Sequence, residues 1–467
     1  MAPAVSANAT SAMEPAWHAE GVTIGDVLDA LSGIRRKFAL TDAGVEEQPH
    51  PRNCVMTLVG VATSEADERR AQRASVAIAA RHPALVIVVR EEPRVRGGRL
   101  NASITTHALN PSSESYAQCE LVSLHVHGAA GEHLAALLDP LLLSGVPTYM
   151  WWLDTPPFGK KELLEALRIC DSLVVDSARF DRPYDSFIGL AALAVSRDRR
   201  LSVADFQWAR LAPWRETIAQ FFEPADRRAF IAGIAELGID YVGNGRGNRI
   251  AAATLIGWFA SALGWKVERA VGGAGGILVA HYTIEGGRQL EVAFRSVNKA
   301  NLAHGEISAV RISGASAGST FRLSIQRDPE RKYQISADAR PQEFLHQHLT
   351  GGDDDAGLEV AQRKAAQHRE VVMRNREALH HTATGNLPGG PAYTSTVLAR
   401  ERRGAENPLV LLTMIDLGGA ETLRHVQRVE AEDEATLLLE LLSTGANDVV
   451  YARSLAAAAN LMRAVQS

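Results

Sequence analysis

The stretch CVMTLVGVATSEADERRAQRASVAIAARHPALVIVVRE, residues 54–91, decides the fold class. Its first ten residues form an almost uninterrupted apolar run, which is typical of a strand buried on both faces of a sheet. Ser64, Glu65 and Asp67 then predict the start of a helix, because a hydroxyl caps it and carboxylates favour the positive end of its dipole. This helix should end at His82-Pro83, before a second buried strand, ALVIVVRE. A strand, a helix and a strand in this order predict a right-handed parallel crossover.

Outward from this unit, apolar runs and helical patterns keep alternating up to about residue 200. The alternation predicts an α/β domain with a mostly parallel sheet over residues 52–200. After residue 201, apolar helical stretches are followed by short alternating runs such as GILVAHYTIEGG and QLEVAFRSV, which predict an antiparallel meander. We therefore expect residues 201–350 to form an α+β domain, with helices packed on one face of the sheet.

Three segments complete the expected organisation. Residues 1–51 are expected to contain a disordered arm, a short helix and a linker, because the first residues are rich in Ala, Ser and Pro. Residues 351–395 are expected to form a charged helix and a Gly/Pro/Thr-rich linker, and residues 396–467 a C-terminal α/β segment.

Composition excludes several classes of protein. Hydrophobic residues make up 46% and charged residues 22%, which are values of a soluble globular protein. The net charge of −5 gives no global field for nucleic acid or for a membrane surface. The N-terminus lacks the pattern of a signal peptide, no apolar run could span a bilayer, and the 3 cysteines are isolated. We therefore expect a cytoplasmic protein.

Four of the 7 tryptophans lie in two short segments, VPTYMWWLDTPPF (residues 146–158) and DFQWARLAPWRETIAQFF (residues 205–222). Tryptophan is enriched where surface is buried against something else, and neighbouring charges orient such an anchor. The expected partner-binding residues are Trp151, Trp152, Asp154, Trp208, Arg210, Trp214 and Arg215. Packing within the chain is the alternative, because successive strand residues point to opposite faces, so that one of Trp151 and Trp152 belongs to the core.

GASAG, residues 314–318, matches the G-x-S-x-G elbow of serine hydrolases, with Ser316 as the nucleophile. Such an elbow needs a strand that turns sharply into a helix, whereas the alternating run STFRLSIQ follows here. Asp338 and His346 lie in a suitable chain order for a triad, but chain order alone is a weak signal. A hairpin turn is therefore favoured, and a hydrolase centred on Ser316 stays an alternative.

The remaining motifs indicate neither a cofactor nor a metal. GGAGG, residues 272–276, lacks the spacing of a phosphate loop, and a strand pattern follows it. His125 and His127 share one face of an expected strand, but no carboxylate or cysteine has the spacing to complete a zinc site. The basic residues of the expected helix 358–379 are interpreted as a solvated face. We expect no catalytic residue, no metal ligand and no cofactor.

Taken in order, five strings resemble the glucose-6-phosphate dehydrogenase assembly protein family (OpcA). They are RNCVMTLVGVAT, RHPALVIVV, LLLSGVPTYMWWLDTPPF, CDSLVVDSARF and DFQWARLAPWRETIAQFF. Together they extend from about residue 52 to residue 222, and the two tryptophan-containing strings are long and specific. The N-terminal arm and the segment after His380 match no motif of the family.

The resemblance implies a non-catalytic subunit that binds glucose-6-phosphate dehydrogenase, the entry enzyme of the oxidative pentose phosphate pathway, and promotes its active oligomer. The tryptophan and arginine segments would then lie at the interface or just beneath it. Two alternatives stay open: the hydrolase centred on Ser316, and a sugar-phosphate sensor that uses the crevice at the carboxyl ends of the strands.

Overall fold

The computed structural model describes residues 16–41, 54–79, 81–93, 98–108, 118–196, 201–243, 248–272, 277–299, 302–327, 409–418, 423–429, 433–443 and 448–466. The chain divides into two compact units, one of Met1–Phe321 with Glu432–Ser467 and one of Arg322–Ala431. The domain boundaries expected from the sequence stay predictions.

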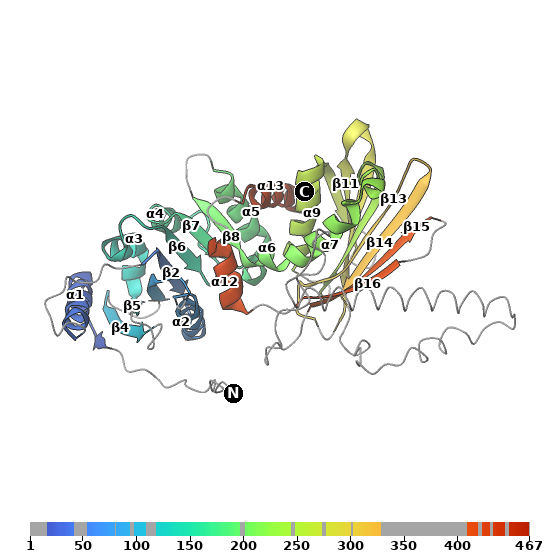
Figure 1. Ribbon diagram of the computed structural model, residues 1–467. Coiled ribbons are helices and arrows are strands. Elements are labelled where there is room, and N and C mark those ends of the chain that lie inside the picture. Colours follow the sequence, from blue (N-terminus) through green and yellow to red (C-terminus); the bar gives the residue numbers. More distant parts are fainter. Residues whose placement is uncertain are drawn as a thin grey trace, which may run out of the picture. The chain divides into compact units, whose positions relative to one another are not determined.

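The first sheet lies in the larger unit and has the strand order β1-β4-β5-β3-β2-β6-β7-β8 (Figure 1). Its strands are β1 (Trp17–Ala19), β2 (Met56–Ala62), β3 (Ala84–Glu92), β4 (Leu100–Ala108), β5 (Gln118–His127), β6 (Thr148–Trp152), β7 (Ser172–Val175) and β8 (Ser202–Asp205). Neighbouring strands from β5 to β8 are parallel, whereas β4 runs antiparallel to β5 and β1 antiparallel to β4. The predicted parallel crossover from β2 to β3 is confirmed.

Helices cover both faces of the first sheet, with α3 and α4 on one side and α2 and α12 on the other (Figure 1). The helices of this part are α1 (Ile24–Thr41), α2 (Glu65–Ala79), α3 (Leu134–Leu138), α4 (Lys161–Ala166), α5 (Pro183–Ala194), α6 (Phe206–Arg210) and α12 (Glu434–Ser443). On the side of α2, one buried cluster combines Leu58 and Trp151 of the sheet with Ile78 of α2 and Leu438 of α12. A helix from near the C-terminus therefore completes the core of the first sheet. Among the described helices, none is long and apolar enough to cross a bilayer.

The second sheet begins with the order β10-β11-β12-β9-β13-β14. These strands are β9 (Ile234–Val242), β10 (Lys266–Gly272), β11 (Leu278–Thr283), β12 (Gln289–Val297), β13 (Ile307–Ser316) and β14 (Ser319–Arg327). The pairs β10/β11, β11/β12 and β9/β13 are antiparallel, as expected for a meander. In the smaller unit, β15 (Leu409–Leu417) and β16 (Leu423–Val429) also pair antiparallel. The predicted α/β part with a mostly parallel sheet and the C-terminal part with a mostly antiparallel sheet are thus confirmed.

The strand β9 departs from a simple meander. It precedes β10 in the chain, yet it lies between β12 and β13 and runs parallel to β12. Parallel neighbours need a long crossover connection, which the helix α9 (Ile250–Leu263) and the strands β10 and β11 supply here. The buried residues Leu237, Ile239 and Tyr241 alternate along β9, and this alternation is the sequence signal for the strand.

The helix α9 packs along α13 (Val449–Gln466), which also contacts α5 and β10. Glycine brings the two helices close together: a Cβ atom on Gly257 would lie 2.2 Å from the carbonyl oxygen of Ser454. Beside this contact, the hydroxyl groups of Ser261 and Ser454 lie 3.3 Å apart. The contact between α9 and α13 therefore depends on the absence of a side chain at residue 257.

We expect the substitution Gly257→Ala to lower the free energy of unfolding by about 1–3 kcal/mol, because the added methyl group overpacks the contact with α13. The sign of this change distinguishes overpacking from helix propensity. In a helix interior without a close neighbour, alanine raises the free energy of unfolding by up to about 1 kcal/mol over glycine. Gly33→Ala in α1 is the matched control, because nothing lies within 4 Å of its added Cβ atom. Urea unfolding of both variants measures the difference, and a stabilised Gly257→Ala protein would contradict the close contact.

Candidate interaction site at the carboxyl edge of the first sheet

The parallel order β5-β3-β2-β6-β7-β8 places the carboxyl ends of these strands along one edge of the sheet. The chain order reverses between β2 and β6, and open α/β sheets bind ligands in the crevice at such a switch point. The side chains that follow these two strands therefore decide whether the crevice is open.

Thr63 follows β2, and Asp154 follows β6. The amide and the hydroxyl of Thr63 both donate to Oδ2 of Asp154, at 3.0 Å and 2.6 Å. The first turn of α2 carries Glu65, Asp67 and Glu68. A pyrophosphate would need free N–H groups and no competing negative charge at this helix start. Carboxylates already occupy it, so the crevice disfavours a dinucleotide.

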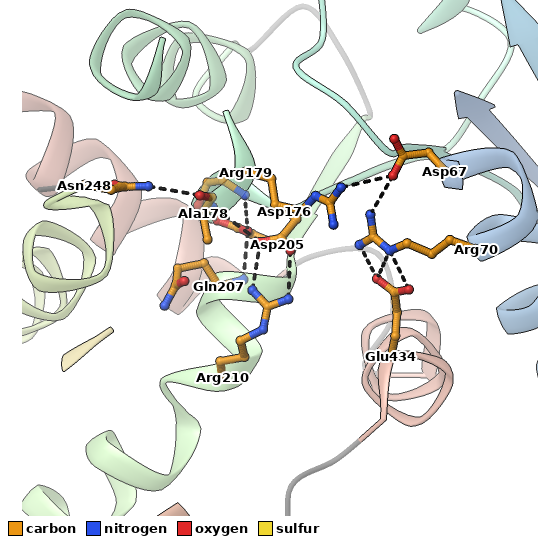
Figure 2. Close-up of polar contacts among 11 residues, drawn as sticks. Asp67, Arg70, Asp176, Ala178, Arg179, Asp205, Gln207, Arg210, Asn248 and Glu434 are labelled. Atoms are coloured by element: carbon orange, nitrogen blue, oxygen red, sulfur yellow. Dashed lines mark hydrogen bonds and ion pairs between the residues drawn. The ribbon is translucent and has the colours of Figure 1, made fainter. Parts of the chain in front are cut away.

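An ionic network extends along the same edge over β7 and α6, as Figure 2 shows. Both Nη atoms of Arg210 on α6 donate to the carboxylate of Asp176, which follows β7, at 2.8 Å each. Arg179, three residues after Asp176, donates to Asp67 of α2 at 3.0 Å. The network thus connects α6 and the end of β7 with the start of α2.

The helix α12 is attached to this edge through Arg70 of α2 (Figure 2). The Nε atom of Arg70 lies 2.6 Å from each carboxylate oxygen of Glu434 on α12. The guanidinium carbon of Arg70 also lies 5.5 Å from the ring centroid of Trp151. Trp151 is fully buried, and its ring centroid lies 5.6 Å from that of Phe206. Trp151 therefore supports α12 from within the core.

Asp205, the last residue of β8, is fully buried and accepts four hydrogen bonds. Its Oδ1 accepts from the amides of Ser177 and Gln207, at 3.0 Å and 2.9 Å. Its Oδ2 accepts from the hydroxyl of Ser177 at 2.6 Å and from that of Tyr451 on α13 at 2.9 Å. Burial raises the pKa of the Asp205 carboxyl, against the opposite effect of these donors. This carboxyl group fastens α13 to the end of β8.

Trp208 of α6 makes a second attachment to α13. Its Nε1 atom donates to Asp448 at 2.7 Å, and the other oxygen of Asp448 accepts from the amide of Tyr451 at 2.8 Å. The guanidinium carbon of Arg215 lies 3.4 Å from the ring centroid of Trp208, and its Nη1 donates to the Trp208 carbonyl oxygen at 2.7 Å. Burial lowers the pKa of Arg215 to about 10, so the side chain keeps its charge at neutral pH.

The structure places five of the expected partner-binding residues along this edge and two beyond it. Those at the edge are Trp151, Asp154, Trp208, Arg210 and Arg215. Trp152 alternates to the opposite face of β6, and Trp214 lies on α7 (Ala212–Phe222); they are 5% and 3% exposed. The four tryptophans are buried within the chain, so they lie beneath its surface. Their part in binding a partner stays a prediction.

A second polar cluster lies where β3 and β5 end. Glu68 of α2 lies 2.6 Å from Nη1 of Arg90 and 2.8 Å from Nε2 of His125. His127 lies 3.4 Å from Glu92. The two histidines thus pair with carboxylates, and the described part of the chain contains no cluster of three metal-binding side chains. Next to them, burial raises the pKa of Glu91 to about 7.

Ser316 lies at the end of β13, and β14 begins at Ser319. Ala317 and Gly318, with φ angles of 50° and 82°, form the two-residue turn between these strands. A hairpin therefore stands where the nucleophile elbow needs a helix. Asp338 and His346 lie outside the described residues, as do the expected helix 358–379 and residues 273–276 of the GGAGG motif.

The reasoning from sequence missed several residues that hold this edge together. They are Arg70, Asp176, Ser177, Asp205, Glu434 and Tyr451. Asp176 and Asp205 carried a usable signal, because each follows an apolar run and caps the helical turn after it. Tyr451 lies 246 residues from Asp205 in the chain, and no pattern in one sequence links two such positions.

The fold and this edge define a protein that has the strand order of dinucleotide-binding domains and carries its own carboxylate, Asp154, at the switch point. Two family models match this chain, the glucose-6-phosphate dehydrogenase subunit N-terminal domain over residues 75–192 and the corresponding C-terminal domain over residues 201–455. The chain belongs to the glucose-6-phosphate dehydrogenase assembly protein family (OpcA). The resemblance found in the sequence is thus confirmed, and the match up to residue 455 extends it into the segment after His380, where no motif of the family was recognised.

Curated relatives come from cyanobacteria. The OpcA protein of Nostoc punctiforme, provisionally named for the OxPP cycle, is 30% identical over 206 residues, which is 43% of each chain. A Synechocystis protein of the same name is 33% identical over 147 residues, 32% of this chain and 30% of the relative. A Synechococcus elongatus relative is 30% identical over 228 residues, 47% of this chain and 50% of its own length. The chain thus spans half or less of the length of these relatives.

Two solved structures are similar at low identity. One is a protein of Erwinia carotovora atroseptica, provisionally named an oxidoreductase, with 11% identity, a TM-score of 0.38, and coverage of 88% of this chain and 98% of that one. The other is levoglucosan dehydrogenase in complex with NADH and L-sorbose, with 11% identity, a TM-score of 0.34, and coverage of 58% and 73%. TM-scores this low carry no argument about function.

We expect Tyr451→Phe to lower the free energy of unfolding by about 1–3 kcal/mol, because the fully buried Asp205 carboxyl loses one of its donors. Tyr149→Phe is the matched control: its hydroxyl lies 3.4 Å from the Leu442 carbonyl oxygen, and we expect a change within about 0.5 kcal/mol. Denaturant unfolding of both variants gives the comparison. Equal losses would contradict the role of Asp205 in fastening α13.

Glu91 predicts a pH dependence of stability. The folded protein keeps this carboxyl protonated up to about pH 7, whereas in the unfolded chain it ionises near the usual glutamate pKa of 4.5. The folded state then binds more protons between these values, so the free energy of unfolding falls as pH rises through this window, by at most about 3 kcal/mol. Glu91→Gln should reduce this fall. Urea unfolding at several pH values tests it, and an identical pH dependence of the variant would contradict it.

Proposed function

We propose that this chain is a non-catalytic, cytoplasmic subunit that binds glucose-6-phosphate dehydrogenase and promotes its active oligomer in the oxidative pentose phosphate pathway. One observation carries the non-catalytic part: at the switch point where a sheet of this order takes its ligand, the amide and the hydroxyl of Thr63 are already hydrogen-bonded to the Asp154 carboxylate. Membership of the assembly protein family supports the choice of partner.

A subunit without chemistry of its own can change a partner only by binding one of its states more tightly than another. Shifting a partner from 1% to 99% active oligomer takes about a 10⁴-fold difference in affinity between the two states. Such selectivity favours a surface that keeps its shape. The attachments of α12 and α13 through Trp151, Trp208 and Asp205 support a rigid surface of this kind.

Two charged side chains at this edge are available for contact. The side chains of Arg179 and Arg210 are 46% and 38% exposed, although each also pairs with a carboxylate. In this proposal the buried tryptophans of the two segments do not contact the partner themselves. They hold in place the helices and arginines that a partner would contact. Trp152 and Trp214 would support the same surface from the layers behind it.

The two alternatives gain no support from the geometry. A sugar phosphate needs a surplus of positive charge, but Arg70, Arg179 and Arg210 are matched here by a larger set of carboxylates, namely Asp67, Asp176, Asp205 and Glu434. A hydrolase needs a helix after Ser316, where β14 lies.

Mixing the purified chain with glucose-6-phosphate dehydrogenase from the same cell tests the proposal. We expect the two proteins to co-elute, and the dehydrogenase to show a larger oligomer in light scattering together with higher activity at low substrate concentration. Co-elution without a kinetic change would restrict the role to binding. If the two proteins do not co-elute and the activity of the dehydrogenase does not change, the proposal is refuted.

A matched pair of variants tests the residue assignment separately. Arg210→Gln removes a half-exposed charge at the proposed surface, whereas Arg269→Gln removes an exposed charge on β10. We expect only the first to weaken binding, provided that thermal unfolding shows both proteins to be folded.

A further inference from the structure

A hollow of about 220 Å³ lies beside β8, between the end of α5 and the first turns of α13. Its lining includes Val195, Ser202, Asp448, Val449, Tyr451 and Arg453, and the other residues that line it are alanine, valine and leucine. The wall is therefore mainly aliphatic, and every lining residue belongs to the larger unit.

Exposed valines gather at the mouth of this hollow. Val195 and Val449 line it and are each 53% exposed, and Val450, next to Val449, is 52% exposed. Single exposed apolar side chains are ordinary on a protein surface, but a contiguous group at the rim of a hollow is typical of an interaction site. The first turn of α13 would favour a negatively charged residue, because of the helix dipole, but it contains the exposed residues Val449 and Val450.

The floor of the hollow is fixed and offers little free polarity. Tyr451 is 1% exposed and donates to the buried Asp205, and both oxygens of Asp448 accept hydrogen bonds from Trp208 and Tyr451. A ligand in the hollow would therefore meet aliphatic side chains and polar groups that already have partners.

The volume distinguishes between kinds of occupant. Small-molecule sites measure about 300–1,000 Å³, which is more than this hollow provides. A dry cavity of about 150 Å³ is enough for benzene, so about 220 Å³ accommodates one large apolar side chain. The hollow suits the anchor side chain of another protein.

Charge at the rim specifies the anchor further. Arg453 is exposed, lines the hollow, and makes no ion pair with any residue that the structure describes. It lies one helical turn after Val449, so the two side chains share a face of α13. A carboxylate next to the apolar anchor would complement this arginine.

We propose that this hollow, lined by α5, β8 and α13, receives an apolar side chain with a neighbouring carboxylate from the surface of glucose-6-phosphate dehydrogenase. The inference rests on the proposed function and adds a specific contact to it. Asp448 and Tyr451 line the hollow and are held by hydrogen bonds, Asp448 to Trp208 and to the amide of Tyr451. The same contacts that fix α13 therefore also fix the floor of the proposed docking site.

Charge introduced into the hollow tests the proposal. Val195→Asp and Val449→Asp should each weaken binding of the purified dehydrogenase at least tenfold, measured by calorimetry. Aspartate at residue 449 falls in the first turn of α13, where a negative charge favours the helix, so folding should be preserved. Val271→Asp on β10 is the control, because Val271 is 48% exposed and lies away from the lining of the hollow. It should bind as the unmodified chain does.

Substitution of the arginine tests the charge. We expect Arg453→Glu to weaken binding severalfold and Arg453→Lys to retain it. A photo-reactive residue at position 450 should cross-link to a segment of the dehydrogenase that carries an apolar residue beside Asp or Glu. A cross-link only within this chain, or to a basic segment, would overturn the proposal.

The outcomes separate this inference from the proposed function. If the unmodified chain binds the dehydrogenase and the variants at residues 195, 449 and 453 bind equally well, the hollow is not the docking site, while the proposed function stands. If the unmodified chain does not bind, the proposed function fails and this contact fails with it.

Discussion

The buried carboxyl group of Asp205 is the constraint on which the rest of this region depends. It ends β8, starts α6, and accepts hydrogen bonds from Ser177 after β7 and from Tyr451 on α13. An unsatisfied carboxyl group at this depth would destabilise the folded state strongly. The elements that supply its donors are therefore held in fixed positions relative to β8. Trp208 extends the same attachment through Asp448, and Arg215 covers its ring. The helix α13, and with it the contact to α9, takes its position from this point.

The switch point between β2 and β6 also carries a carboxylate of the chain itself. In a sheet of this order, the helix start after β2 is well suited to hold an anionic ligand. Here Asp154 supplies that negative charge from within the chain. The fold thus keeps the strand order of a ligand-binding domain but uses the switch point as a structural joint. An assembly function is consistent with such a joint, because the arrangement favours a fixed outer surface over an exchangeable ligand.

Local patterns were enough to predict much of the fold. The apolar run of β2, the capped start of α2 and the second run of β3 specify their own crossover. The insertion of β9 between β12 and β13 was missed, because strand order depends on contacts that are distant in sequence. The tryptophan segments were found from their composition. Their burial under α12 and α13 could not be found this way, since Leu438 and Tyr451 carry no local mark of a contact with Trp151 or Asp205.

The return of α12 and α13 also has a consequence for the order of events during synthesis. The layer over Trp151 and the donor to Asp205 come from residues 434–466, so the first sheet cannot complete its core while the ribosome is still adding the middle of the chain. Closing a contact across 246 residues is slow, and until then the faces meant for α12 and α13 lie open. The nascent chain therefore passes through a stage in which its bulkiest aromatic side chains are accessible to chaperones.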